Sequence, residues 1–135
     1  MKMTNKEVVY SFIAAINGHD TDRIYNLMSE DHVFIDGYGN RCKGRKEMKN
    51  GWIKYFEMFP DYLIEITDYA ENETMSGLFG FAGATFKNKK NESDSNYWRI
   101  PAALKAIVKD GKIKYWQVFC DYSRLLKIIE NNQID

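Results

Sequence analysis

Asp110 and Gly111 open the stretch DGKIKYWQVFCD, residues 110–121, which joins a turn signal to a strand pattern. An Asp-Gly dipeptide before alternating apolar and polar residues is typical of the last arm of a β-hairpin. Because side chains alternate across a strand, the odd-numbered residues share one face. These are Ile113, Tyr115, Gln117, Phe119 and Asp121. A mostly apolar face that ends in a carboxylate suits proton chemistry inside a cavity, so the function depends on whether this face lines one.

The composition indicates a single globular domain over residues 1–135. Aromatic residues make up 15% of the chain, enough both to fill a core and to line a pocket for a ring-shaped ligand. The formal net charge is zero, which argues against a nucleic-acid binder and favours self-association, so we expect a homodimer.

Cys42 and Cys120 are far apart and match no metal-ligand or redox spacing. We therefore expect two free thiols, no metal site and no cofactor. The N-terminus lacks the apolar segment of a secretory signal, and no apolar run approaches the roughly 20 residues that span a membrane. The sequence thus predicts a cytoplasmic protein without membrane contact.

Helical signals dominate the first part of the chain. Thr4 and Glu7 have the spacing of a capping box, and the helix that they begin is predicted to end at Gly18. A second helix is predicted over about 21–29. A third begins near Gly44 and ends before Pro60.

Strand signals follow. One short strand is predicted at 33–35, and longer ones at 62–67, 75–86, 97–108 and 113–122. Gly77, Gly80 and Gly83 interrupt the second long strand and indicate a bulge or strong curvature. The polar residues 87–96 predict a hairpin loop, and 123–130 a final helix. This order predicts an α+β fold, a curved and mostly antiparallel sheet packed against about three N-terminal helices.

Four segments resemble the SnoaL-like branch of the nuclear transport factor 2-like superfamily, whose cone-shaped fold is shared with ketosteroid isomerase. They are Asn17-Gly18-His19-Asp20, the Gly44 start of the third helix, Phe59-Pro60-Asp61, and the run from Asp110-Gly111-Lys112-Ile113 to Asp121-Tyr122. The resemblance extends from about residue 6 to 126. It implies the fold more strongly than any activity, because this fold is used by enzymes and non-enzymes.

The resemblance also implies catalytic positions. In SnoaL-like polyketide cyclases an aspartate near the end of the last long strand is the general acid/base of an aldol ring closure, and Asp121 occupies a similar place. Asp36 resembles the base of the ketosteroid isomerases. The isomerase's oxyanion groups would fall near Phe12 and near Ala102 or Ala103, which cannot supply them, so ketosteroid isomerisation is not expected.

Each candidate has a structural alternative. Asp121 is either the proton-transfer group or a cap for the last helix, and Asp36 is either a base or a turn residue. Arg99 either binds a ligand anion or pairs with an acid across the sheet. The remaining ligand-binding candidates are Tyr115 and Gln117, beside Asp121 on its strand face, and Trp52 and Phe56, which are core residues that could also line a pocket.

We therefore expect a small-molecule binding protein or a cofactor-free acid/base enzyme. Its ligand would be an apolar or aromatic carbonyl compound, and its reaction an isomerisation or aldol cyclisation by proton transfer. The alternative is a non-catalytic ligand-binding or dimeric interaction module of the same fold.

Overall fold

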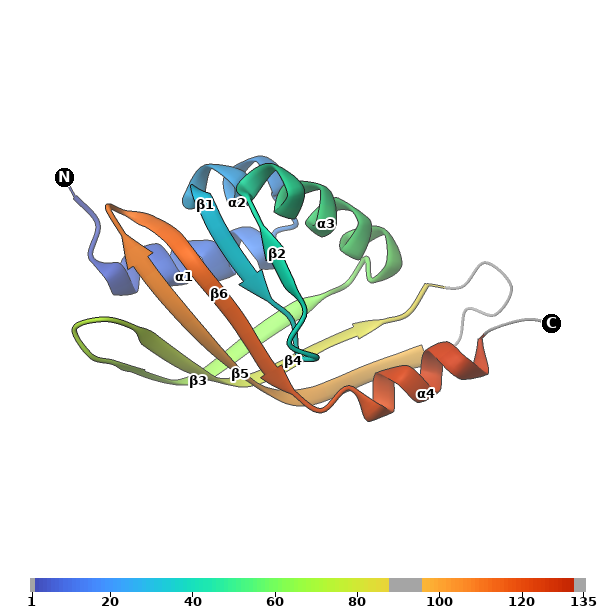
Figure 1. The fold of residues 1–135 in the computed structure, drawn as a ribbon. Helices are drawn as coiled ribbons and strands as arrows, with labels where there is room; N and C mark the ends of the chain where they lie inside the picture. Colours follow the sequence, from blue (N-terminus) through green and yellow to red (C-terminus); the bar gives the residue numbers. More distant parts are fainter. Residues whose placement is uncertain (1, 88–95, 133–135) are drawn as a thin grey trace.

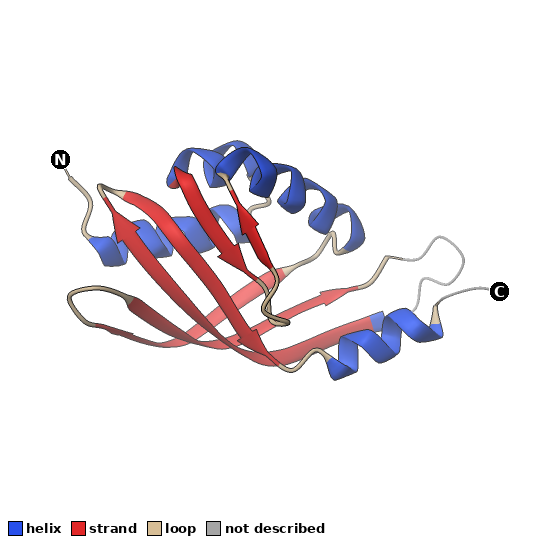
Figure 2. Ribbon diagram, in the orientation of Figure 1, coloured by secondary structure: helices blue, strands red, loops and turns tan. Residues whose placement is uncertain are grey.

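Helices and two strands come first in the chain, followed by four long strands and a final helix (Figures 1 and 2). The structure, a computed structural model, describes residues 2–87 and 96–132. Its elements are α1 (Asn5–Asn17), α2 (Thr21–Leu27), β1 (Met28–Ile35), β2 (Arg41–Lys43), α3 (Arg45–Met58), β3 (Leu63–Glu71), β4 (Ser76–Thr85), β5 (Tyr97–Lys109), β6 (Lys112–Cys120) and α4 (Ser123–Asn131).

The strands form one curved sheet in the order β2-β1-β6-β5-β4-β3. All neighbours are antiparallel except β1 and β6, which are parallel. Helices α1 to α3 lie on one side of the sheet, and α4 extends from the end of β6 (Figure 1). The predicted α+β architecture is therefore confirmed. None of the helices in the described residues is long and apolar enough to cross a membrane.

The capping box predicted for α1 is present. The Thr4 hydroxyl accepts a hydrogen bond from the Glu7 backbone, and the Thr4 N–H donates to the Glu7 carboxylate, at 3.1 and 3.0 Å. At the other end, the Asn17 side chain bonds both backbone groups of Ile64, at 2.9 and 2.8 Å. These two bonds anchor the end of α1 to the edge strand β3.

Helix α3 begins after Gly44, as predicted. Gly44 has φ of +100°, a conformation that glycine adopts without the strain a side chain would add. Its N–H donates to the His32 carbonyl at 2.7 Å, which fixes the start of α3 against β1. The helix then carries its aromatic face toward the inner side of the sheet.

Two predictions about the first strands were wrong. Strand β1 begins at Met28, where the second helix was expected to continue to Ser29, and strand β2 was not predicted. Both differences arise from pairing with distant segments, because β1 pairs with β6 and β2 pairs only with β1. The loop predicted over 87–96 lies, apart from its two end residues, outside the described part of the chain.

The glycines of β4 do mark a bend in the sheet. A side chain at Gly80 would place its Cβ only 1.9 Å from the Glu65 carbonyl oxygen, so the two strands approach too closely for any other residue. The register of β3 shifts between Ile66 and Asp68, directly beside Gly80. Such a bulge increases local twist, which curls this part of the sheet around the helices.

The core lies between α1–α3 and the inner face of the sheet. Phe12 packs edge-on against Trp116, with ring centroids 4.9 Å apart, and both side chains are fully buried. Cys42 and Cys120 are free and half-buried. Burial raises the pKa of both thiols, which keeps them protonated near neutral pH.

Candidate ligand cavity

The main cavity has a volume of about 540 Å³ and lies between α3, the inner face of the sheet and α4. This volume falls in the range of small-molecule sites. Its wall is largely aromatic. The aromatic residues that line it are Phe34, Tyr38, Trp52, Tyr55, Phe59, Tyr62, Trp116 and Tyr122.

Helix α3 supplies one wall because its apolar residues recur at helical spacing. Trp52, Tyr55 and Phe59 project from this helix and its C-terminal cap into the cavity wall. Their rings interlock with Tyr62. The Tyr55 and Tyr62 rings meet at 90° with centroids 5.0 Å apart, and Tyr55 lies 4.7 Å from Phe59. This packing indicates a wall that is formed before any ligand arrives.

Strand β6 supplies the opposite wall with Trp116 and Val118, which are even-numbered residues. The odd-numbered residues of β6 therefore do not line this cavity. Ile113 pairs with Val108, but Tyr115 pairs with Ile107, so Lys114 has no partner in β5. One extra residue in a strand reverses which face every later side chain occupies. Ile113 points into the core as expected, and the alternation then inverts.

Asp121, Tyr115 and Gln117 consequently lie away from the cavity. Asp121 is exposed and accepts a 2.9 Å hydrogen bond from the Ser123 backbone N–H at the start of α4. Tyr115 donates a 2.5 Å hydrogen bond to Gln117 on the outer face of the sheet. The structure thus brings none of these three candidates to the cavity wall. Asp121 holds the start of α4 from the residue before its N-cap, Tyr122, whose own side chain makes no capping bond.

Arg99 also lies on the outer face. It forms a 3.0 Å ion pair with Glu65 on β3, and its guanidinium stacks 3.8 Å above the Phe81 ring. All three residues lie on adjacent strands of the same face. The arginine therefore pairs with an acid across the sheet and is not positioned to bind an anion in the cavity.

Two predicted residues do line the cavity, Trp52 and Asp36. Phe56 does not, because it is buried between the Trp52 ring, with centroids 5.5 Å apart, and the His19 ring, with centroids 4.0 Å apart. Tyr55 follows Trp52 by three residues on a helix, and this spacing in the sequence already placed the two on one face. Tyr62 and Tyr122 carry no such signal, because their positions depend on how the strand ends pack.

Asp36 holds the tight turn between β1 and β2. Its carboxylate accepts hydrogen bonds from the backbone N–H groups of Tyr38 and Asn40, both at 2.9 Å, and from the Asn40 side chain at 3.2 Å. These bonds serve the turn, as the structural alternative proposed. The same residue is part of the cavity wall, so a ligand can reach it.

Charged side chains in the lining are few. They are Asp36, Arg41 and Glu47. Arg41 and Glu47 are solvent-exposed, as are the lining residues Met58 and Leu126, so these residues mark the mouth of the cavity. The interior is apolar and aromatic. An arrangement of this kind favours a neutral ring system over a highly charged ligand.

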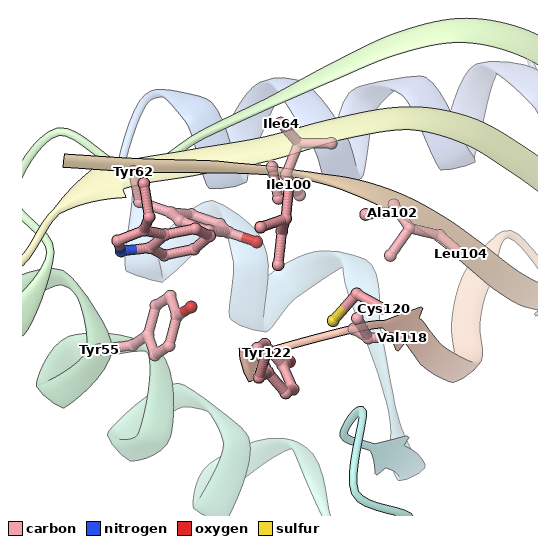
Figure 3. A pocket seen from close by; sticks show the side chains of 11 residues that line it. Tyr55, Tyr62, Ile64, Ile100, Ala102, Leu104, Val118, Cys120 and Tyr122 are labelled. Atoms are coloured by element: carbon pink, nitrogen blue, oxygen red, sulfur yellow. The ribbon is translucent and has the colours of Figure 1, made fainter. Parts of the chain in front are cut away.

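A side chamber of about 10 Å³ adjoins the main cavity and shares six lining residues with it (Figure 3). Tyr55, Tyr62 and Cys120 bring polar atoms to its wall. Burial raises the pKa of both tyrosines well above the usual range, so both hydroxyls stay protonated. The chamber therefore offers neutral hydrogen-bonding groups.

The chain belongs to the SnoaL-like domain family, which it matches over residues 9–116. The sequence shows no significant match among curated proteins.

Solved structures share the fold at low sequence identity. A ketosteroid isomerase-like protein from Catenulispora acidiphila, solved in complex with trimethylamine, has a TM-score of 0.79 at 18% identity, covering 92% of each chain. IdmH from Streptomyces antibioticus, a candidate polyketide cyclase, has a TM-score of 0.78 at 16% identity, covering 95% of this chain and 99% of its own. An NTF2-like protein from Cytophaga hutchinsonii has a TM-score of 0.72 at 17% identity, covering 93% and 97%.

Proposed function

We propose that the main cavity binds an apolar or aromatic small molecule. The observation that carries this proposal is the aromatic-lined volume of about 540 Å³, open at a mouth between α3 and α4. Protein interiors are normally close-packed, so an unfilled aromatic-lined volume of this size indicates a binding site. Similar folds described as polyketide cyclases support a ligand that is a polyketide-like ring compound.

The test is a titration with 2-ethylnaphthalene, an apolar aromatic probe, followed by tryptophan fluorescence and calorimetry. Val118 lines the cavity, so Val118→Phe fills part of the volume and should weaken binding about tenfold or more. Gln117→Phe adds the same ring one residue away on the outer face and should leave binding unchanged. Equal affinity in the two variants would contradict the proposal.

Acid/base catalysis is the second candidate function, favoured by the position of Asp36 on the cavity wall. It can be tested with 5-nitrobenzisoxazole, a general probe for a carboxylate base in an apolar site. The base removes the ring C–H proton, the N–O bond breaks, and a coloured cyanophenolate is released. Asp36→Asn retains an oxygen for the turn and should abolish the acceleration. Asp121→Asn should keep it. A wild-type rate no faster than buffer, or an unchanged rate in Asp36→Asn, would leave binding as the function.

We also propose that a second copy of the chain covers the outer face of the sheet. Phe79 on β4 and Phe119 on β6 are about half exposed, and Ala103 on β5 pairs with both, so an apolar row crosses three strands. Monomeric proteins rarely expose contiguous apolar surface of this kind. The zero net charge is compatible with self-association.

A further inference from the structure

The side chamber differs from the main cavity in carrying a cluster of polar atoms. Figure 3 shows the hydroxyls of Tyr55 and Tyr62 and the sulfur of Cys120 pointing toward the same space from different elements. The rest of the wall is mostly aliphatic. It consists of Ile64, Ala82, Ile100, Ala102, Leu104 and Val118, together with the aromatic residues Trp98 and Tyr122. Three polar atoms that converge inside an apolar wall are the pattern expected where a ligand's own polar group is recognised.

Neither tyrosine hydroxyl has a protein partner in the part of the chain that the structure describes. Tyr62 is only 9% exposed, so its hydroxyl depends on partners inside the cone. Tyr122 differs, because Cys120 and the Gly37 backbone lie close enough to its hydroxyl to affect its pKa. Buried hydroxyls are normally hydrogen-bonded, because a polar group removed from water without a partner destabilises the protein. The two phenols are therefore available as donors to a ligand atom.

The size and charge of the chamber restrict what that atom can be. A volume of about 10 Å³ suits one small group, such as a single oxygen. Among the residues that the structure describes, no Asp, Glu, Lys, Arg or His lines the chamber. A carboxylate or phosphate placed there would lose its hydration without gaining a counter-charge. A neutral oxygen fits, and a carbonyl oxygen has two lone pairs, one for each phenol.

We propose that the side chamber binds a ligand carbonyl oxygen through the hydroxyls of Tyr55 and Tyr62. The ligand is then an aromatic ketone or quinone whose carbonyl end enters first, while its ring system occupies the main cavity. This inference rests on the proposed function, since it assigns the chemistry of one end of the same ligand. The two phenols would recognise the carbonyl group of the ligand, a role that neither Asp36 nor Asp121 fills.

The experiment compares two probes of nearly equal shape, 2-acetylnaphthalene and 2-ethylnaphthalene, which differ by a carbonyl in place of a methylene. Wild-type protein should bind the ketone about tenfold more tightly, as two net hydrogen bonds allow. The Tyr55→Phe/Tyr62→Phe double variant should lose this preference and still bind 2-ethylnaphthalene with wild-type affinity. Tyr97→Phe, which removes an exposed hydroxyl outside both the cavity and the chamber, should keep the preference.

The outcomes separate the two proposals. If wild-type protein binds both probes equally, or if the double variant still prefers the ketone, the assignment of the chamber is overturned and the proposed binding function stands. If neither probe binds to wild-type protein, both proposals are overturned. If the double variant still binds 2-ethylnaphthalene, its cavity is intact. A lost preference for the ketone then reflects the missing hydroxyls and not a folding defect.

Discussion

Asp121 accepts a 2.9 Å hydrogen bond from the backbone N–H of Ser123, the first residue of α4. That bond favours the ionised carboxylate and lowers the pKa of Asp121. A base that acts near neutral pH needs the opposite shift. The residue that the sequence analysis favoured for proton transfer is thus an exposed carboxylate that holds the start of a helix.

For Asp121→Asn we expect unchanged affinity for 2-ethylnaphthalene and only a small change in Tm. The asparagine oxygen still accepts the Ser123 N–H, and the side chain lies outside the cavity. Calorimetric titration and thermal unfolding measure both quantities. A loss of probe binding without a loss of Tm would show that Asp121 reaches the ligand after all.

Stability should fall as the pH drops below about 6.5, because of His32. This side chain is fully buried, and its Nδ1 lies 2.7 Å from the Ile113 carbonyl, which a neutral ring can satisfy by donating. Burial lowers the pKa of His32. Below the unfolded pKa of about 6.5 the unfolded chain takes up a proton that the folded chain refuses, so acid favours unfolding.

Urea unfolding of wild-type protein at pH 7.5, 6.5 and 5.5 measures this slope. His32→Asn can keep a donor toward Ile113 and removes the titration, so its stability should vary less over the same range. An identical slope in His32→Asn would assign the effect to other groups.

Two glycine substitutions should have opposite effects on the free energy of unfolding. Gly80→Ala forces a Cβ into the Glu65 carbonyl and should destabilise the protein by about 3 kcal/mol. Gly51 lies within α3 with open space around it, so Gly51→Ala should stabilise by about 0.5–1 kcal/mol. Denaturant unfolding gives both values. Equal effects would mean that β3 can move away from Gly80 at little cost.

The proposed dimer can be tested at the outer face of the sheet. Phe119→Glu places a charge in the exposed apolar row and should convert a dimer into a monomer in sedimentation velocity. Leu126→Glu is a matched control, because Leu126 is similarly exposed, at 47% against 49% for Phe119, but lies at the cavity mouth. A wild-type monomer, or dissociation by both substitutions alike, would argue against this interface.

Local signals in the sequence predicted most of the fold. The Thr4 and Glu7 capping box, the glycine before α3 and the Asp-Gly turn before β6 each act over a few neighbouring residues, and all appear where expected. Strand β2 lacked such a signal. Three residues have little intrinsic preference for a strand, and pairing with β1 alone stabilises them there.

The candidate site was predicted less well, and a single residue accounts for much of the error. Lys114 has no partner in β5, and this inverts the alternation of β6 after Ile113. Nothing in the local pattern of the strand distinguishes a regular alternation from one with an extra residue. Whether Val118 or Gln117 faces the helices is decided by the register with β5, which depends on the packing of the whole sheet.

The sequence by itself determined the helices, the long strands and their order along the chain. It also determined that enough aromatic residues are present to line a cavity. These features follow from spacing, capping and turn chemistry between near neighbours. Only the tertiary structure decided which carboxylate and which phenols share the cavity. Asp36, Tyr55 and Tyr62 lie together there because a bulge, the bent sheet and the position of α3 bring separate segments together. Residues from such separate segments leave no local sequence pattern that could predict their contact.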